Sequence, residues 1–65
     1  MFAHRFRVGQ SVMVQANAFR GTPPGPYKVV RLLPPSGMTN QYHLRSLKNG
    51  QERVVGEDDI FRNDH

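Results

Sequence analysis

The sequence predicts an all-β domain of five short strands, because it lacks the signals of a helix and repeats those of a strand. No stretch of ten residues carries apolar side chains at the i, i+3, i+4, i+7 spacing of an amphipathic helix without an interrupting Pro or Gly. Short runs of alternating apolar and polar residues occur instead, separated by Gly, Pro and Asn. The 6 Gly and 5 Pro among 65 residues suit a small sheet with tight turns.

Length and composition predict one small domain. A chain of this size buries only about 60% of the surface that its unfolded form exposes, so its core must be thin. We expect a single domain over residues 1–65, with a core from 6 to 61 and flexible ends at 1–4 and 63–65. The absence of Cys removes disulfides and thiolate ligands. No apolar run approaches 18 residues and no basic-then-apolar leader is recognised, so we expect a cytoplasmic protein without a membrane partner.

The first strand is placed by apolar alternation. Val12 and Val14 share one face of it, and Met13 lies on the opposite face. A loop over residues 19–26 follows, because its three prolines cannot donate to a ladder.

The second strand is predicted from Tyr27 to Leu33, with Pro34 ending it and a loop continuing through residue 40. Neither face of this strand is cleanly apolar. We therefore predict a β-bulge near Val29-Val30 that sends Lys28 and Arg31 outward and turns the aliphatic side chains inward.

A hairpin follows from Asn49-Gly50, the preferred pair for a two-residue type I′ turn. Such a turn would set Lys48 opposite Gln51 and Leu44 opposite Val55. On the core face this register places Tyr42, Leu44 and Val55. On the other face it places His43, Arg45, Glu52 and Val54, with Arg45 and Glu52 able to pair.

The remaining residues predict one short turn and a last strand. Residues 57–60 read as a tight helical turn, with the acids at the N-terminal end that the helix dipole favours. Phe61 and Arg62 then form the final strand. Four aromatic side chains are expected in the core: Phe6, Tyr27, Tyr42 and Phe61.

Three stretches of the sequence resemble known small barrels. The pattern Phe6-x-x-Gly9-x-x-Val12-x-Val14, then Phe19-x-Gly21, then Gly25-x-Tyr27-x-Val29 resembles the opening of SH3-like barrels of the KOW and Tudor kind. The segment from Gly25 to Pro34 is similar to one in the SH3-like C-terminal domain of retroelement integrases. The closing Arg53-Val54-Val55-x-Glu57-x-Asp59-Ile60 resembles the end of small bacterial SH3-like proteins.

The resemblance implies a five-stranded, partly open SH3-like barrel with one short 3-10 turn before the last strand. Such families bind RNA, DNA, ribosomal surfaces, methylated lysines or other proteins, so the fold alone does not select a function. A methyl-lysine reader needs a cage of aromatics, and only Phe2 and Phe19 lie outside the predicted core. A peptide-binding SH3 groove needs acids in its first loop, and this first loop has none.

The charge distribution points to a polyanion partner. The chain carries a net +4, but residues 1–48 hold seven cations and no acid, whereas residues 49–65 hold two cations and five acids. A basic body suits RNA or DNA, although an ordinary solvated surface would look the same. The predicted nucleic-acid site consists of basic side chains that contact phosphate and two planar groups that stack on bases: Arg20, Lys28, Arg31, Arg45 and Lys48, with Phe19 and His43.

The alternative is a protein-interaction module. An uncovered edge strand, or the proline-rich loop at residues 22–26, would then dock onto another protein.

Catalysis, metal binding and cofactor binding are not expected. His4, His43 and His65 are spread along the chain without the spacing of a zinc site. Glu57, Asp58 and Asp59 are consecutive, whereas acid–base catalysis needs carboxylates that face one another across a cleft. We expect these acids to cap the turn and to pair with the basic body. A barrel of this size also lacks room for a small-molecule substrate pocket.

Overall fold

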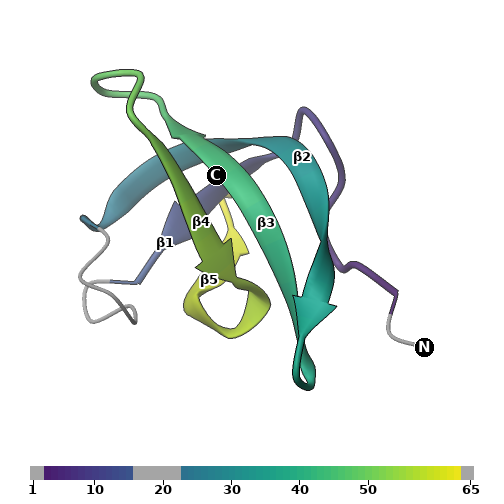
Figure 1. The fold of residues 1–65 in the computed structure, drawn as a ribbon. Helices are drawn as coiled ribbons and strands as arrows, with labels where there is room; N and C mark the ends of the chain where they lie inside the picture. The colour runs from purple at the N-terminus through teal and green to yellow at the C-terminus, as the bar shows by residue number, and fades with distance from the viewer. Residues whose placement is uncertain (1–2, 16–22, 64–65) are drawn as a thin grey trace.

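The computed structural model describes residues 3–15 and 23–63, which form one antiparallel sheet of five strands (Figure 1). The elements are β1 (Ser11–Val14), β2 (Gly25–Ser36), β3 (Thr39–Ser46), β4 (Glu52–Gly56), the 3-10 turn η2 (Glu57–Asp59) and β5 (Ile60–Arg62). The strand order is β4-β3-β2-β1-β5, so β4 and β5 are the two edges of the sheet. The all-β prediction and the single turn before the last strand are confirmed. The described residues include no helix able to cross a membrane.

The predicted bulge in β2 is present, with Val30 as the extra residue. Val29 pairs with Leu44 and Arg31 with His43, so one residue of β2 has no counterpart on β3. The bulge turns Lys28 and Arg31 to the same face, as expected. The expected inward turn of the aliphatic side chains holds only for Val29, which is 1% exposed, while Val30 and Leu32 each stay 38% exposed.

The β2–β3 connection is tighter than the sequence predicts. β2 continues past Pro34 to Ser36, which pairs with Thr39 across a two-residue turn. The register shifts between Leu33 and Ser36, where Pro34 and Pro35 have no N–H to donate. The predicted loop through residue 40 is therefore wrong, because the prolines are accommodated as an irregularity within the strand.

The β3–β4 hairpin has a four-residue loop instead of the predicted two-residue turn. Ser46 N–H donates to Gln51 O at 2.8 Å, and Gly50 N–H donates to Ser46 O at 2.9 Å. Gly50 has φ +76°, the left-handed region that glycine enters without strain. The Ser46 hydroxyl accepts from the amides of Lys48 and Asn49, which stabilises the longer loop.

The longer loop moves the hairpin register by two residues but leaves every side chain on its predicted face. Tyr42 pairs with Val55, His43 with Val54 and Arg45 with Glu52. Side chains alternate with a period of two along a strand, so a shift of two residues preserves the faces whereas a shift of one would invert them.

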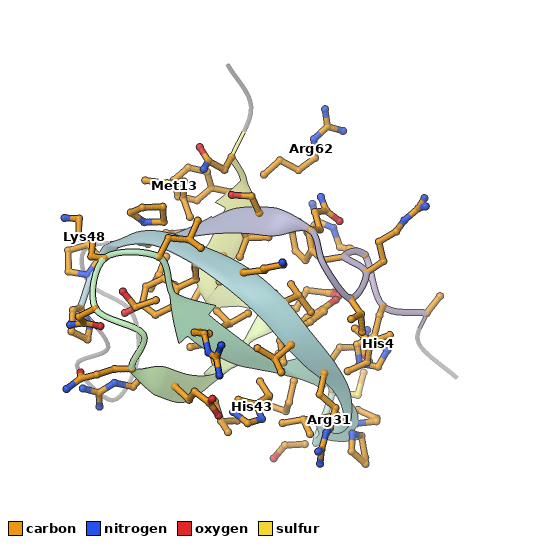
Figure 2. All side chains as sticks on the ribbon, turned by 90° about the horizontal axis from the view of Figure 1, so that it is seen from above. His4, Met13, Arg31, His43, Lys48 and Arg62 are labelled. Carbon is orange, nitrogen blue, oxygen red and sulfur yellow. The ribbon has the colours of Figure 1, made fainter. Side chains whose placement is uncertain are left out.

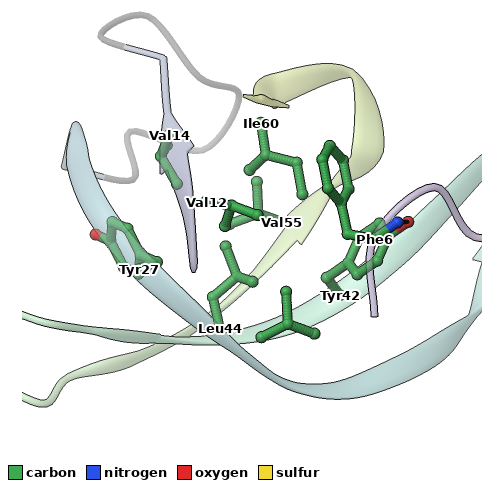
Figure 3. Packing of buried hydrophobic residues seen from close by; sticks show 9 residues of the cluster. Phe6, Val12, Val14, Tyr27, Tyr42, Leu44, Val55 and Ile60 are labelled. Carbon is green, nitrogen blue, oxygen red and sulfur yellow. Dashed lines mark hydrogen bonds between the residues drawn. The ribbon is translucent and has the colours of Figure 1, made fainter. Parts of the chain in front are cut away.

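Nine apolar residues form the core between the curved strands (Figure 3): Phe6, Val12, Val14, Tyr27, Val29, Tyr42, Leu44, Val55 and Ile60. Burial of an aliphatic or aromatic side chain contributes about 1.5–3 kcal/mol. The prediction for Phe61 is wrong, since its side chain is 48% exposed. The 3-10 turn points Ile60 inward, and alternation then sends Phe61 out beside its cross-strand neighbour Met13.

The segment before β1 is tied to the sheet through Tyr42 and Glu57. The Tyr42 hydroxyl accepts from the amides of Arg5 at 2.9 Å and Phe6 at 3.2 Å, and donates to the Glu57 carboxylate. Glu57 also accepts from the Arg5 amide and from the side-chain amide of Asn40. Burial and then the hydrogen bond to Glu57 raise the pKa of Tyr42 to about 12, so the hydroxyl remains a donor.

The ends of the described segments are also bonded to the sheet. His4 Nε2 lies 2.8 Å from Leu33 O, and the side-chain amide of Asn63 donates to the Ser11 hydroxyl at 2.9 Å. The 3-10 turn has no side-chain cap, since the residue before it is Gly56. The Glu57 carboxylate does not cap the turn either, because it accepts from the Arg5 amide of the N-terminal segment.

Substitution Tyr42→Phe should destabilise the fold by about 2–3 kcal/mol, because the buried Phe6 amide loses its acceptor and Glu57 loses a donor. Tyr27→Phe is the matched control. Its hydroxyl donates to Pro23 O, a carbonyl beside solvent, so the loss should be about 0.5–1.5 kcal/mol. Urea unfolding of both variants measures the difference, and equal losses would contradict the role given to the Tyr42 hydroxyl.

Candidate nucleic-acid interface

Four of the predicted site residues lie on the face of the β2–β3–β4 sheet that points away from the core, which we call the outer face. Cross-strand pairing arranges this face in three rows. The first row is Lys28, Arg45 and Glu52, the second is Arg31, His43 and Val54, and the third is Leu33, Gln41 and Gly56. Directly opposite side chains in such rows lie roughly 5 Å apart at Cβ. Pairing therefore brings Lys28, Arg31, His43 and Arg45 together.

Glu52 is the one carboxylate in the three rows among the described residues, and it is shared by two neighbours. Arg45 Nη2 lies 3.0 Å from Glu52 Oε2, and His43 Nε2 lies 2.6 Å from Glu52 Oε1. The hydrogen bond from Arg45, followed by that from His43, lowers the pKa of the Glu52 carboxyl. The expected Arg45–Glu52 pair is thus present, and it partly neutralises the basic face.

Lys28 and Arg31 have no ion-pair or hydrogen-bond partner within the described residues, and both side chains are exposed. They remain available to an external anion. With His43 neutral, the three cations and one carboxylate leave a formal charge of +2 on the outer face.

Lys48 lies beside the Gly25 end of β2, whereas Arg31 lies near the middle of that strand. Its side chain reaches over Gly25, where a Cβ would be 3.7 Å from the ammonium nitrogen. At about 3.3 Å per residue, six residues of β2 separate this point from Arg31 by roughly 20 Å. Figure 2 shows Lys48 well apart from Arg31 and His43. Phe19 and Arg20 lie outside the described residues.

The described part of the outer face offers little base stacking. His43 carries the one ring among the predicted residues described there, and its side chain is 26% exposed and bonded to Glu52. The exposed aromatic that sequence reasoning missed is Phe61, which lies on β5 next to Met13 on β1. The alternation in Val12-Met13-Val14 placed Met13 outward, but nothing local distinguishes Ile60 from Phe61 as the buried residue.

Of the predicted proline-rich loop, Pro23 and Pro24 are exposed, whereas Gly25 and Pro26 belong to β2. Pro26 O accepts from the amide of Leu47, so this end of the segment is part of the sheet. Among the described residues, no three His, Asp or Glu side chains are grouped closely enough to hold a metal ion.

No known family model, curated protein or solved structure matches this chain. The candidate interface therefore rests on the geometry of the outer face.

Arg45→Gln should raise the pKa of the Glu52 carboxyl toward its ordinary value of 4.5, because the hydrogen bond from Arg45 is the main cause of the lowered pKa. Lys28→Gln is the control, since Lys28 lies in the same row without a bond to Glu52. The carboxyl carbon shift of Glu52, followed by NMR against pH, measures both. Equal effects of the two substitutions would show that general charge, rather than the Arg45 contact, sets this pKa.

Proposed function

We propose that this chain is a non-catalytic nucleic-acid-binding module whose outer face contacts RNA or DNA. The observation that carries the proposal is that the β2 bulge gathers Lys28 and Arg31 beside Arg45 on one exposed face, with Lys28 and Arg31 unpaired within the described residues. Cations that are exposed and unpaired lose no existing ion pair when they contact phosphate.

We further propose that the sheet belongs to the SH3-like barrels. The supports are the consecutive antiparallel order, the return of β5 to pair with β1, and the 3-10 turn immediately before β5. The long, bent β2 also pairs with both β1 and β3, as the strands of a small barrel do.

The outer face supports phosphate contacts more than base recognition. Lys28, Arg31 and Arg45 donate hydrogen bonds and accept none, and phosphate contacts carry no direct sequence information. We therefore propose binding with weak sequence preference and strong salt dependence. Arg45 must exchange Glu52 for a phosphate oxygen, whereas Lys28 and Arg31 need no exchange.

An amide-resolved NMR titration with single-stranded RNA and with duplex DNA tests the function. Shifts should cluster at Lys28, Arg31, His43 and Arg45. If three cations each contact one phosphate, raising the salt from about 50 to about 200 mM should weaken binding roughly 20- to 40-fold. Arg31→Ala and Arg45→Ala should each weaken binding similarly for all sequences and reduce the salt slope by about 0.7–0.9.

Arg62→Gln is the control for those variants, because it removes the same charge from the far strand β5 (Figure 2). It should leave the affinity close to that of the unmodified chain. The absence of shifts at the lower salt concentration, where charges are least screened, would reject the proposed function.

Glu52→Gln should tighten nucleic-acid binding by roughly threefold or more at low salt, because it removes the carboxylate that competes with phosphate for Arg45 and His43. Asp58→Asn makes the same change in net charge at a carboxylate that contacts neither Arg45 nor His43, so it should have a smaller effect. Fluorescence anisotropy with a labelled single-stranded RNA measures both affinities. Equal gains in the two variants would mean that Glu52 has no specific part in the interface.

A further inference from the structure

The edge strand β4 presents unpaired backbone groups. It occupies one end of the strand order, and within the described residues its single neighbour is β3. Ser46 N–H donates to Gln51 O, so Gln51 directs its backbone groups toward β3. Every second residue of β4 after Gln51 does the same, and the residues between them direct their backbone groups away from β3. Arg53 and Val55 therefore direct their amides and carbonyls toward β3, and those of Glu52, Val54 and Gly56 point away from the sheet.

β4 lacks two of the features that protect an edge strand from pairing. It contains no Pro and no bulge in its pairing with β3, and its Val54 side chain is 45% exposed on the outer face. Its backbone can thus accept an additional extended strand.

A hollow of about 330 Å³ adjoins the Gly56 end of β4, which is more room than the size of the domain predicts. Its walls come from the β2–β3 turn, β3, β4 and the 3-10 turn, and no cation lines it: Ser36, Thr39, Gln41, Val54, Val55, Gly56, Asp58 and Asp59. Asp58 gives it negative charge, and the Asp58 side chain is exposed.

Gly56 keeps this hollow open. Its φ of −77° and ψ of 151° are ordinary extended values, so the backbone there does not need glycine. A Cβ at this position would lie 3.3 Å from Thr39 Cγ2 and 3.5 Å from Gln41 Nε2, within the space between these side chains. The absence of a side chain at Gly56 therefore shapes the hollow rather than the chain path.

We propose that β4 binds an extended segment of another protein by strand addition, with an Arg or Lys side chain seated in the hollow beside Asp58. A strand residue opposite Gly56 shares its face and so projects over the hollow. The residue opposite Val54 projects over an exposed apolar side chain. In antiparallel pairing the occupant thus has the pattern basic-x-apolar. This proposal is independent of nucleic-acid binding by the outer face.

A second copy of this chain does not meet that requirement. Two-fold pairing of β4 about Val54 would set Glu52 of one copy opposite Gly56 and beside Asp58 of the other. Two-fold pairing about Arg53 would place two guanidinium groups opposite each other. Like charges at opposed positions destabilise a strand pair in these two registers, and two-fold pairing about Val55 would set the uncharged Val54 opposite Gly56. A second copy therefore places no basic side chain over the hollow in any of the three registers.

The test is an NMR titration with the acetylated and amidated peptide Thr-Arg-Thr-Val-Thr-Gln. Amide shifts should concentrate at Glu52, Val54, Gly56 and Asp58, with millimolar or tighter affinity. The control peptide has the same composition with Arg and Val adjacent, which sends their side chains to opposite faces. It should bind about fivefold more weakly or worse. No shifts along β4, or equal affinity of the two peptides, would overturn the proposal.

Backbone pairing and charge are tested separately. In an extended peptide, alternate amides point toward β4 and away from it. N-methylation of one of these two sets should weaken binding by about tenfold or more, and N-methylation of the other set should leave the affinity unchanged.

Asp58→Asn should weaken binding of the Arg peptide about two- to fivefold. The same substitution should leave the affinity for a peptide with Gln in place of Arg unchanged. Equal affinities of the two methylated peptides would overturn the proposal. So would an equal effect of Asp58→Asn on the affinities of the Arg and Gln peptides. Sedimentation that shows β4-dependent dimers without peptide binding would assign the edge to a second copy instead.

Discussion

The extra residue in β2 is the constraint on which the other features depend. In a regular strand, residues 28 and 31 would point to opposite faces, because their separation is odd. The bulge at Val30 turns Lys28 and Arg31 to the same face and keeps Val29 in the core. Val29 also donates its amide to Gln10 O at 3.0 Å and accepts from Gly9 N–H at 2.8 Å. The bulge thus assembles the basic surface, and the residue beside it also joins the segment before β1 to the sheet.

The acids of the second half of the chain have separate structural environments, although the sequence presents them as one block of negative charge. Glu52 lies among cations on the outer face. Burial of Glu57 would raise the pKa of its carboxyl, but the hydrogen bonds from Tyr42, Arg5 and Asn40 outweigh that effect and lower the pKa. Asp58 faces solvent beside the hollow. The separately predicted Arg45–Glu52 pair is present, whereas Glu57, for which pairing with the basic body was expected, holds the N-terminal segment through the backbone amide of Arg5.

Local patterns in the sequence predicted which face each strand residue occupies, and geometry over longer distances accounts for what they missed. The assignment of His43, Arg45, Glu52 and Val54 survived a register error of two residues, because faces repeat with that period. The loop length was wrong because the Ser46 hydroxyl bonds two loop amides, a contact with no signature in residue type. The bonds among Arg5, Tyr42 and Glu57 join residues far apart in the chain, and no periodicity reports such contacts.

The two proposed surfaces share β4, and their charges set how they interact. Glu52 contributes its side chain to the basic rows and its backbone to the exposed edge. A peptide paired with β4 would place its basic side chain at the Gly56 end, and Arg45 lies opposite Glu52 at the other end of the strand. Four residues of strand separate these ends by roughly 13 Å, which exceeds the Debye length of about 8 Å at physiological salt. Electrostatic coupling between a bound peptide and a bound polyanion is thus screened in the cell and grows as salt is lowered, so the two surfaces can act on separate partners within one small sheet.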